Sequence, residues 1–101
     1  MSIERPLTIV RSSRARSDLL DIWLYISDDS VAAADRVLDE IDRVCRLISE
    51  HPEIGRERPE VGRELRSFAT MSWVIFYRID GEMIRIVRIA HGARDFDQLD
   101  F

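Results

Sequence analysis

The chain has 101 residues, of which 46% are hydrophobic and 34% are charged, and its formal net charge is −4. This length and balance predict one globular domain, covering residues 1–101, with a modest core and no disordered tract. No apolar stretch approaches the roughly 18 residues that cross a bilayer, and the N-terminus does not resemble a signal peptide. The single cysteine excludes an intrachain disulfide, so we expect a cytoplasmic protein.

The charge is distributed unevenly along the chain. Residues 17–53 hold ten acidic residues and three arginines, whereas residues 54–94 hold eight arginines and five acidic residues, which gives local charges of −7 and +3. Every basic residue is an arginine. Such a polarised chain can present a cationic surface to a polyanion or to an acidic partner, although two solvated faces are the commoner cause of this pattern.

The N-terminal half predicts a short strand and a helical hairpin. PLTIV (6–10) has the β-branched and aliphatic residues of a strand. Apolar residues then recur at helical spacing, which predicts helices over about 14–28 and 31–49, with Cys45 in the apolar stripe of the second. The connection between them is so short that the helices should pack as an antiparallel pair. The expected N-caps are Ser12 or Ser13 and Ser30.

The C-terminal half predicts a loop and three strands. Two prolines and two glycines indicate a loop at 51–66. Strands are expected at Leu65–Ala69, 73–79 and 83–90, and the pair Asp80-Gly81 signals a hairpin between the last two. The order β-α-α-β-β-β predicts an α+β domain, with the helical hairpin packed on a mostly antiparallel sheet.

The hairpin register decides which arginines share a face of the sheet. A two-residue loop at Asp80-Gly81 pairs Arg78 with Met83 and places Arg88 on the opposite face. A three-residue loop pairs Arg78 with Glu82 and places both arginines on one face. That second register also groups residues as follows: Val74, Phe76, Ile84 and Ile86 on one face, and Trp73, Ile75, Tyr77, Met83, Val87 and Ile89 on the other. The sequence leaves both registers open.

Both faces of these strands are strongly apolar, so each needs a cover. The helical hairpin can cover only one of them. The second is covered either by a partner protein or by the chain itself, through the loop at 51–66 and a C-terminal tail that includes Leu99 and Phe101. The sequence does not choose between these two covers.

Cationic residues gather near the predicted strand ends. A guanidinium group keeps its charge and offers a planar fork to carboxylate or phosphate, which suits a target-binding patch. The candidate residues are Arg66, Arg78, Arg88, His91 and Arg94. Two histidines and one cysteine give no metal-ligand spacing, and no glycine-rich phosphate loop is present, so we expect neither a metal nor a cofactor.

Three segments in this order resemble the ParE branch of the RelE/ParE toxin superfamily: SDLLDIWLYIS, ISEHPEIGRERPEVGRELRSFA and WVIFYRIDGEMIRIVRIAHGARDF. The resemblance runs from about Leu7 to Phe96. It implies the toxin of a bacterial type II toxin–antitoxin system, which inhibits DNA gyrase by stabilising its cleaved complex with DNA. Such a toxin acts by binding and breaks no bond itself, so no catalytic residue is expected.

The resemblance also implies a ParD-like antitoxin, which represses its operon and commonly has an acidic tail. The antitoxin would lay a helix on the helical hairpin and extended chain beside the sheet. Trp23, Leu24 and Tyr25 would line its groove, although Trp23 is also a candidate core residue. The toxin would reach operator DNA only through this antitoxin.

Two alternatives remain open at this point. Toxins of the related RelE branch cut messenger RNA on the ribosome, and they use arginines and lysines together with a C-terminal tyrosine. This sequence has no lysine, and Phe96 follows Arg94-Asp95, so it resembles ParE more. His91 could still act as an acid or base, with arginines stabilising charge. The third interpretation is an inactive relative that survives as an interaction module.

Overall fold

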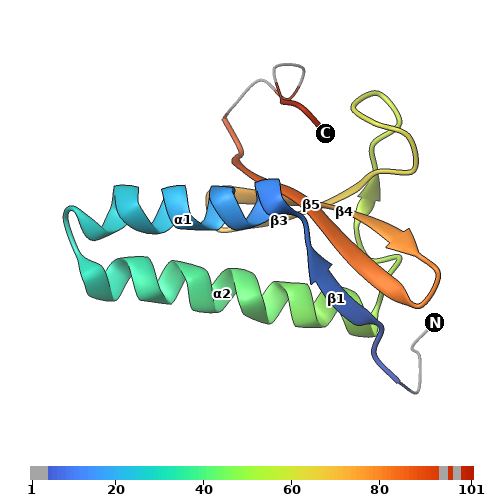
Figure 1. Ribbon diagram of the computed structural model, residues 1–101, viewed down its shortest axis with the longest axis horizontal. Coiled ribbons are helices and arrows are strands. Elements are labelled where there is room, and N and C mark those ends of the chain that lie inside the picture. Colours follow the sequence, from blue (N-terminus) through green and yellow to red (C-terminus); the bar gives the residue numbers. More distant parts are fainter. Residues whose placement is uncertain (1–4, 94–95, 97–98) are drawn as a thin grey trace.

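A helical hairpin packs against one face of a five-stranded sheet in the computed structural model of the chain (Figure 1). The structure describes residues 5–93, 96 and 99–101. The two helices lie side by side along most of their length (Figure 1). In chain order the elements are β1 (Thr8–Arg11), α1 (Ser13–Ser27), α2 (Val31–Glu50), β2 (Arg56–Glu57), β3 (Arg66–Thr70), β4 (Trp73–Asp80) and β5 (Met83–His91).

The predicted fold class is confirmed, with one strand that the sequence did not reveal. The sheet order is β1-β5-β4-β3-β2, with β1 parallel to β5 and the other neighbouring strands antiparallel. The additional strand, β2, lies inside the expected loop at 51–66. Its two residues are both exposed and charged, so no alternation of apolar side chains marks it in the sequence.

Both helices begin at predicted caps. The Ser12 hydroxyl oxygen accepts a hydrogen bond from the Ala15 N–H at 3.0 Å, and the Ser30 hydroxyl oxygen accepts one from the Ala33 N–H at 3.1 Å. Each bond satisfies a donor that the start of a helix leaves without an intrahelical partner. Within the described part of the chain, no helix combines the length and apolar character that a membrane crossing requires.

The β4–β5 hairpin has a register that differs from both predicted ones. Asp80 pairs with Met83, so the loop consists of Gly81-Glu82 and Arg78 faces neither of its predicted partners. Gly81 has a φ of +60°, a conformation that favours glycine at the first position of a type II′ turn. Asp-Gly is more often the central pair of a turn, and here the glycine opens the loop instead. The turn therefore lies one residue later, and the partner of Arg78 becomes Arg85 in place of Met83.

A β-bulge in β5 changes which side chains share a face. The pairing shifts between Phe76 and Tyr77 of β4, which makes Val87 the extra residue of β5. Ile84 and Ile86 therefore join Tyr77 on the helical side of the sheet, and Val87 joins Phe76 on the other side. The predicted grouping of these residues was wrong, because strict alternation cannot reveal a bulge.

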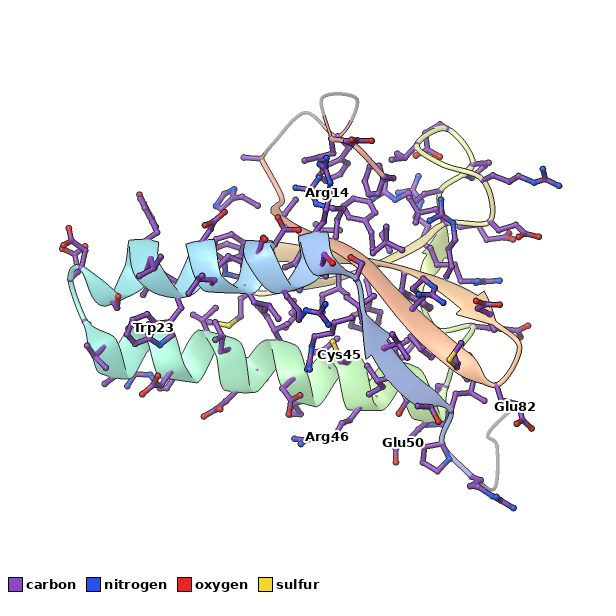
Figure 2. All side chains as sticks on the ribbon, in the orientation of Figure 1. Arg14, Trp23, Cys45, Arg46, Glu50 and Glu82 are labelled. Atoms are coloured by element: carbon purple, nitrogen blue, oxygen red, sulfur yellow. The ribbon has the colours of Figure 1, made fainter. Side chains whose placement is uncertain are left out.

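The sheet has a core on each face. The larger core lies between the sheet and the helical hairpin and includes Cys45, which is fully buried as predicted. Figure 2 shows Cys45 between α2 and the strands. The second core lies on the opposite face and contains the following residues: Leu65, Val74, Phe76, Val87, Ala90 and Leu99, with Val61, Phe96 and Phe101 packed against them.

The chain itself supplies much of the cover for the second sheet face. Phe96 and Phe101 pack edge to face on Phe76, with ring centroids 5.0 and 4.9 Å away. Leu65 from the loop and Leu99 from the tail complete the contact. Of the two covers that the sequence left open, the loop and tail are the ones present, so this face is not left uncovered for a partner protein.

Candidate interaction surfaces

Arg88 is held in an ion pair with Asp18 of α1. The guanidinium donates to both carboxylate oxygens, at 2.8 and 3.0 Å, and to the Asp100 carbonyl oxygen at 2.9 Å. The two side chains are only 10% and 12% exposed. The hydrogen bonds that Arg88 donates to Asp18 raise the pKa of Arg88 above its ordinary value. Its charge is therefore compensated inside the protein.

The pair completes the edge of β5 where β1 ends. The last pairing between these strands joins Arg11 and Ile86, and beyond it α1 takes over as the neighbour of β5. The Ser12 hydroxyl donates to the Val87 carbonyl oxygen at 2.8 Å, and the Asp18 carboxylate accepts the Ile89 N–H at 2.9 Å. Asp18 thus replaces a missing strand as well as pairing with the arginine.

Arg66 anchors the loop that follows α2. It donates to the Gly55 carbonyl oxygen at 2.8 Å and to the Glu53 carbonyl oxygen at 3.3 Å, while Glu57 lies 3.7 Å away. These contacts, which are made mainly with backbone carbonyls, tie the loop to β3.

Tyr77 holds the same loop from inside the core. Its hydroxyl donates to the Pro52 carbonyl oxygen at 2.7 Å and accepts the Gly55 N–H at 2.8 Å. A Cβ atom on Gly55 would lie 2.5 Å from that hydroxyl, so the close approach requires glycine. Burial raises the pKa of Tyr77.

Arg78 lies on the opposite face of the sheet from Arg66. Arg66 pairs with Tyr77, and residues directly opposite each other on antiparallel strands share a face, whereas Arg78 follows Tyr77 and points the other way. The Arg78 guanidinium is half-buried and donates to the Arg63 carbonyl oxygen at 2.9 Å. A carbonyl carries no net charge, so this bond leaves the positive charge of Arg78 uncompensated.

His91 lies at the far end of the hairpin. It pairs with Trp73, where β4 begins, whereas Arg78 is near the end of β4. The His91 ring packs edge to face on Trp73 with centroids 5.2 Å apart, and its Nδ1 accepts the Ala93 N–H at 3.1 Å. The fifth predicted residue, Arg94, lies outside the described residues.

The described candidates therefore do not form one cationic patch. Arg88 is neutralised, Arg66 and Arg78 are on opposite faces, and His91 is several residues along the hairpin from Arg78. The sequence suggested a cluster because the residues are close in the chain. Alternation separates Arg66 from Arg78, whereas the bulge pairs Arg88 with Phe76 and so places Arg88 on the same face as Arg78, where Asp18 compensates its charge. Which of them contact a target remains a prediction.

The predicted antitoxin residues also point in different directions. Consecutive helical residues differ by about 100° around the axis, so three in a row cannot share a narrow face. The Trp23 indole N–H donates to Asp35 of α2 at 2.9 Å, and Figure 2 shows Trp23 on the side of α1 that faces α2. Leu24 and Tyr25 are 54% and 80% exposed.

Leu20 belongs to this surface, although sequence reasoning missed it. It is 58% exposed and lies one turn before Leu24, where the spacing of four residues aligns the two side chains. The sequence did indicate this exposed position, because Leu20 lies outside the apolar stripe that turns toward α2 and is spaced four residues from Leu24. The outer face of α1 is defined here as Leu20, Leu24 and Tyr25.

Two hollows lie at opposite parts of the sheet. The larger, of about 340 Å³, is lined by residues of the loop and of the strands beside it, among them Glu57, Arg66 and Ile79. The smaller, of about 200 Å³, lies between α1 and the end of β5. Among the residues that the structure describes, no group of three or more histidines, cysteines and acidic residues is placed to hold a metal ion.

Known proteins with similar sequences identify the family. The family model described as the ParE toxin of the type II toxin–antitoxin system parDE matches residues 9–96. This chain belongs to the ParE toxin family. It is therefore a type II toxin of the ParE/RelE kind, and the resemblance seen in the sequence is confirmed.

Individual relatives of this toxin carry both names. Toxin ParE1 of Caulobacter vibrioides is 35% identical over 81 residues, which cover 79% of this chain and 83% of the relative. Toxin RelE2 of the same bacterium is 35% identical over 86 residues, 85% and 96% of the two chains. Identity alone thus does not separate the two branches.

A solved structure confirms the fold of the toxin. The structure described as the chromosomal ParDE TA system from P. aeruginosa matches with a TM-score of 0.70 at 19% identity, covering 84% of this chain and 95% of that one. At this identity the likeness speaks for the fold alone.

Proposed function

We propose that this toxin is a ParE-like inhibitor of DNA gyrase and that a ParD-like antitoxin neutralises it. The family model that matches most of the chain is the ParE one, which supports the antitoxin and the target together. Gyrase acts on bacterial DNA, so the proposed site of action is the cytoplasm.

The observation that carries this proposal is the environment of Phe96. The toxins that cut messenger RNA use a tyrosine near the C-terminus, as the resemblance implied. Here the position after Arg94-Asp95 holds a phenylalanine, whose ring packs on Phe76 in the second core. The Arg58 guanidinium lies 5.7 Å from the centroid of the same ring. Phe96 therefore serves packing and offers no hydroxyl for proton transfer.

The surroundings of Arg88, one of the arginines that could stabilise charge in a ribonuclease, also argue for binding rather than cleavage. A developing negative charge on a phosphate is stabilised by groups that are free to face it. The Arg88 guanidinium instead faces Asp18, which already compensates its charge. These contacts favour the ParE-like function over the ribonuclease alternative.

The outer face of α1 is the proposed antitoxin surface. Its three large side chains are each more than half exposed, and the helix lies at the outside of the two-layer fold (Figure 1). An amphipathic helix can lay its apolar side on such a stripe. The second sheet face, in contrast, is already occupied by the toxin's own tail.

The test is a supercoiling assay with purified gyrase, paired with measurement of messenger RNA integrity after induction of the toxin in cells. We expect the toxin to abolish supercoiling, to accumulate cleaved DNA, and to leave messenger RNA intact. Ribosome-dependent cleavage of messenger RNA with normal supercoiling would support the ribonuclease alternative instead. Normal growth on induction without antitoxin would indicate an inactive interaction module.

A further inference from the structure

The smaller hollow has the chemistry of a cation-binding pocket. It lies between α1 and the meeting point of β4 and β5, and Tyr25, Trp73 and His91 contribute aromatic walls. Trp73 and His91 support each other edge to face, at an interplanar angle of 84°, which fixes this wall. The faces of aromatic rings attract cations, tryptophan most strongly.

Two carboxylates from α1 enter the same hollow, and they differ in their partners. Asp18 already pairs with Arg88 and accepts the Ile89 N–H. Asp21 is one turn further along the helix and forms no hydrogen bond or ion pair with the residues that the structure describes. The Asp18–Arg88 pair contributes no net charge, so Asp21 makes the hollow negative.

The surroundings carry the same sign. The segment from Ser17 to Glu53, which includes most of α1 and all of α2, has a local charge of −7. A partner that lies on α1 therefore approaches an acidic surface and is attracted through its own basic side chains. An acidic segment would be repelled here, whatever it binds elsewhere on the toxin.

We propose that this hollow receives an arginine or lysine side chain from the antitoxin segment that lies on the outer face of α1. The aliphatic part of the side chain would lie on Ile22 and Tyr25, and its charged end would pair with Asp21 against Trp73. Arginine suits the site better, because its planar guanidinium can stack on an aromatic ring and bond a carboxylate at the same time. This inference rests on the proposed antitoxin.

A small probe tests the pocket without the antitoxin. Isotope-labelled toxin is titrated with N-acetyl-arginine amide, and the Trp73 indole signal is followed by NMR. We expect a saturable shift that the neutral analogue N-acetyl-citrulline amide does not cause. Asp21→Asn should weaken probe binding roughly two- to fivefold, the range of an exposed ion pair, because the aromatic contact stays in place. Asp29→Asn, in the turn between the helices, is the matched control and should bind as the wild type does.

Four results of these titrations would overturn the proposal. The first is equal binding of the citrulline probe, and the second is an unchanged affinity in Asp21→Asn. The third concerns other occupants: putrescine binding more tightly than the arginine probe would indicate a small-molecule cation site. The fourth is tighter probe binding by Arg94→Ala, which would indicate that the toxin's own arginine competes for the hollow.

The complex supplies the second readout. The dissociation rates of the toxin–antitoxin complex are compared for Asp21→Lys and Asp29→Lys. We expect the first to dissociate about tenfold faster and the second to match the wild type, since Asp21 lines the hollow and Asp29 does not. Equal rates would overturn the pocket and leave the proposed function standing. If wild-type toxin binds no antitoxin at all, the proposed function fails, and the probe titration still decides the pocket.

Discussion

At the scale of single residues, Tyr77 links the core to the loop after α2. The hydroxyl is the only part of this fully buried side chain that is polar, and it bonds both Pro52 and Gly55. Removing a buried hydrogen bond destabilises a fold more than removing an exposed one, because the partner left behind cannot bond to water instead. Tyr77 is therefore a structural residue, although it lies near arginines that were candidates for target binding.

Tyr77→Phe should lower the free energy of unfolding by about 1–3 kcal/mol, because a backbone N–H and a carbonyl lose their partner. The measurement is urea denaturation followed by circular dichroism. Tyr25→Phe is the matched control, since that side chain is 80% exposed, and it should change stability by less than about 0.5 kcal/mol. Equal effects of the two substitutions would refute the role given to Tyr77.

Arg78 is the described candidate best able to contact a negatively charged target, because its bond to a carbonyl leaves its charge uncompensated. Arg78→Ala should weaken gyrase inhibition about tenfold or more, the loss expected for one charge contact in an interface. Arg36→Ala, on the exposed side of α2, is the matched control and should inhibit as the wild type does. Full inhibition by Arg78→Ala would remove this residue from the target surface.

At the scale of elements, the Asp18–Arg88 pair joins α1 to β5. Asp18→Ala should lower the free energy of unfolding by about 3 kcal/mol, because the substitution leaves a largely buried guanidinium without its counter-charge. Thermal and urea unfolding give the measurement. Asp21→Ala, one turn along the same helix and exposed, is the comparison. An equal decrease in its free energy of unfolding would argue that the Asp18–Arg88 pair does not join α1 to β5.

Glu40 makes a second connection, between α2 and β3. Its carboxylate accepts two bonds from Arg43 and one from the Thr70 hydroxyl at 2.7 Å. These bonds, first that of Arg43 and then that of Thr70, lower the pKa of Glu40 from its ordinary 4.5 to about 2. A carboxyl whose pKa falls on folding stabilises the folded state above its ordinary pKa.

The stability that Glu40 provides should therefore be fully present above pH 4.5 and disappear as the pH falls toward 2. Urea midpoints measured between pH 7 and pH 2.5 test this, and Glu40→Gln should flatten the acid part of the profile. Thr70→Val removes one of the bonds and should give an intermediate profile. A Glu40→Gln profile parallel to the wild type would contradict the assignment.

Periodicity alone predicted the elements well. The helices begin at Ser13 and Val31 as their serine caps indicate, because capping and helical spacing are local properties of the sequence. The hairpin was located correctly, but its register was not. The glycine that opens the turn moves each partner in β5 by two residues, and the bulge at Val87 shifts the alternation by one residue. Neither has a signal in a single sequence.

The candidate sites were predicted less well, because they depend on those shifts. Arg88 was a candidate for the target-binding patch and is paired with Asp18, which lies 70 positions away in the chain. No local pattern connects those two residues. Leu20, in contrast, could have been found from its spacing to Leu24.

At the scale of the whole molecule, the toxin covers one apolar surface with its own chain and leaves another open. The tail residues Phe96 and Phe101 occupy the second sheet face, and Arg14 pairs with Asp100 at 2.9 Å beside them. Figure 2 shows Arg14 next to this C-terminal segment. The outer face of α1 has no such cover in the part of the chain that the structure describes. A partner that protects the toxin should therefore bind α1.

The most direct test of this account is the affinity of the toxin for its antitoxin, measured by calorimetry. Two variants are compared, and each truncates one large, exposed apolar side chain to alanine. Leu24→Ala removes a 54% exposed side chain from α1, and Met71→Ala removes a 65% exposed side chain from the turn between β3 and β4. We predict that Leu24→Ala weakens binding about tenfold or more and that Met71→Ala leaves it unchanged. An unchanged affinity in Leu24→Ala, or an equal loss in both variants, would contradict the account.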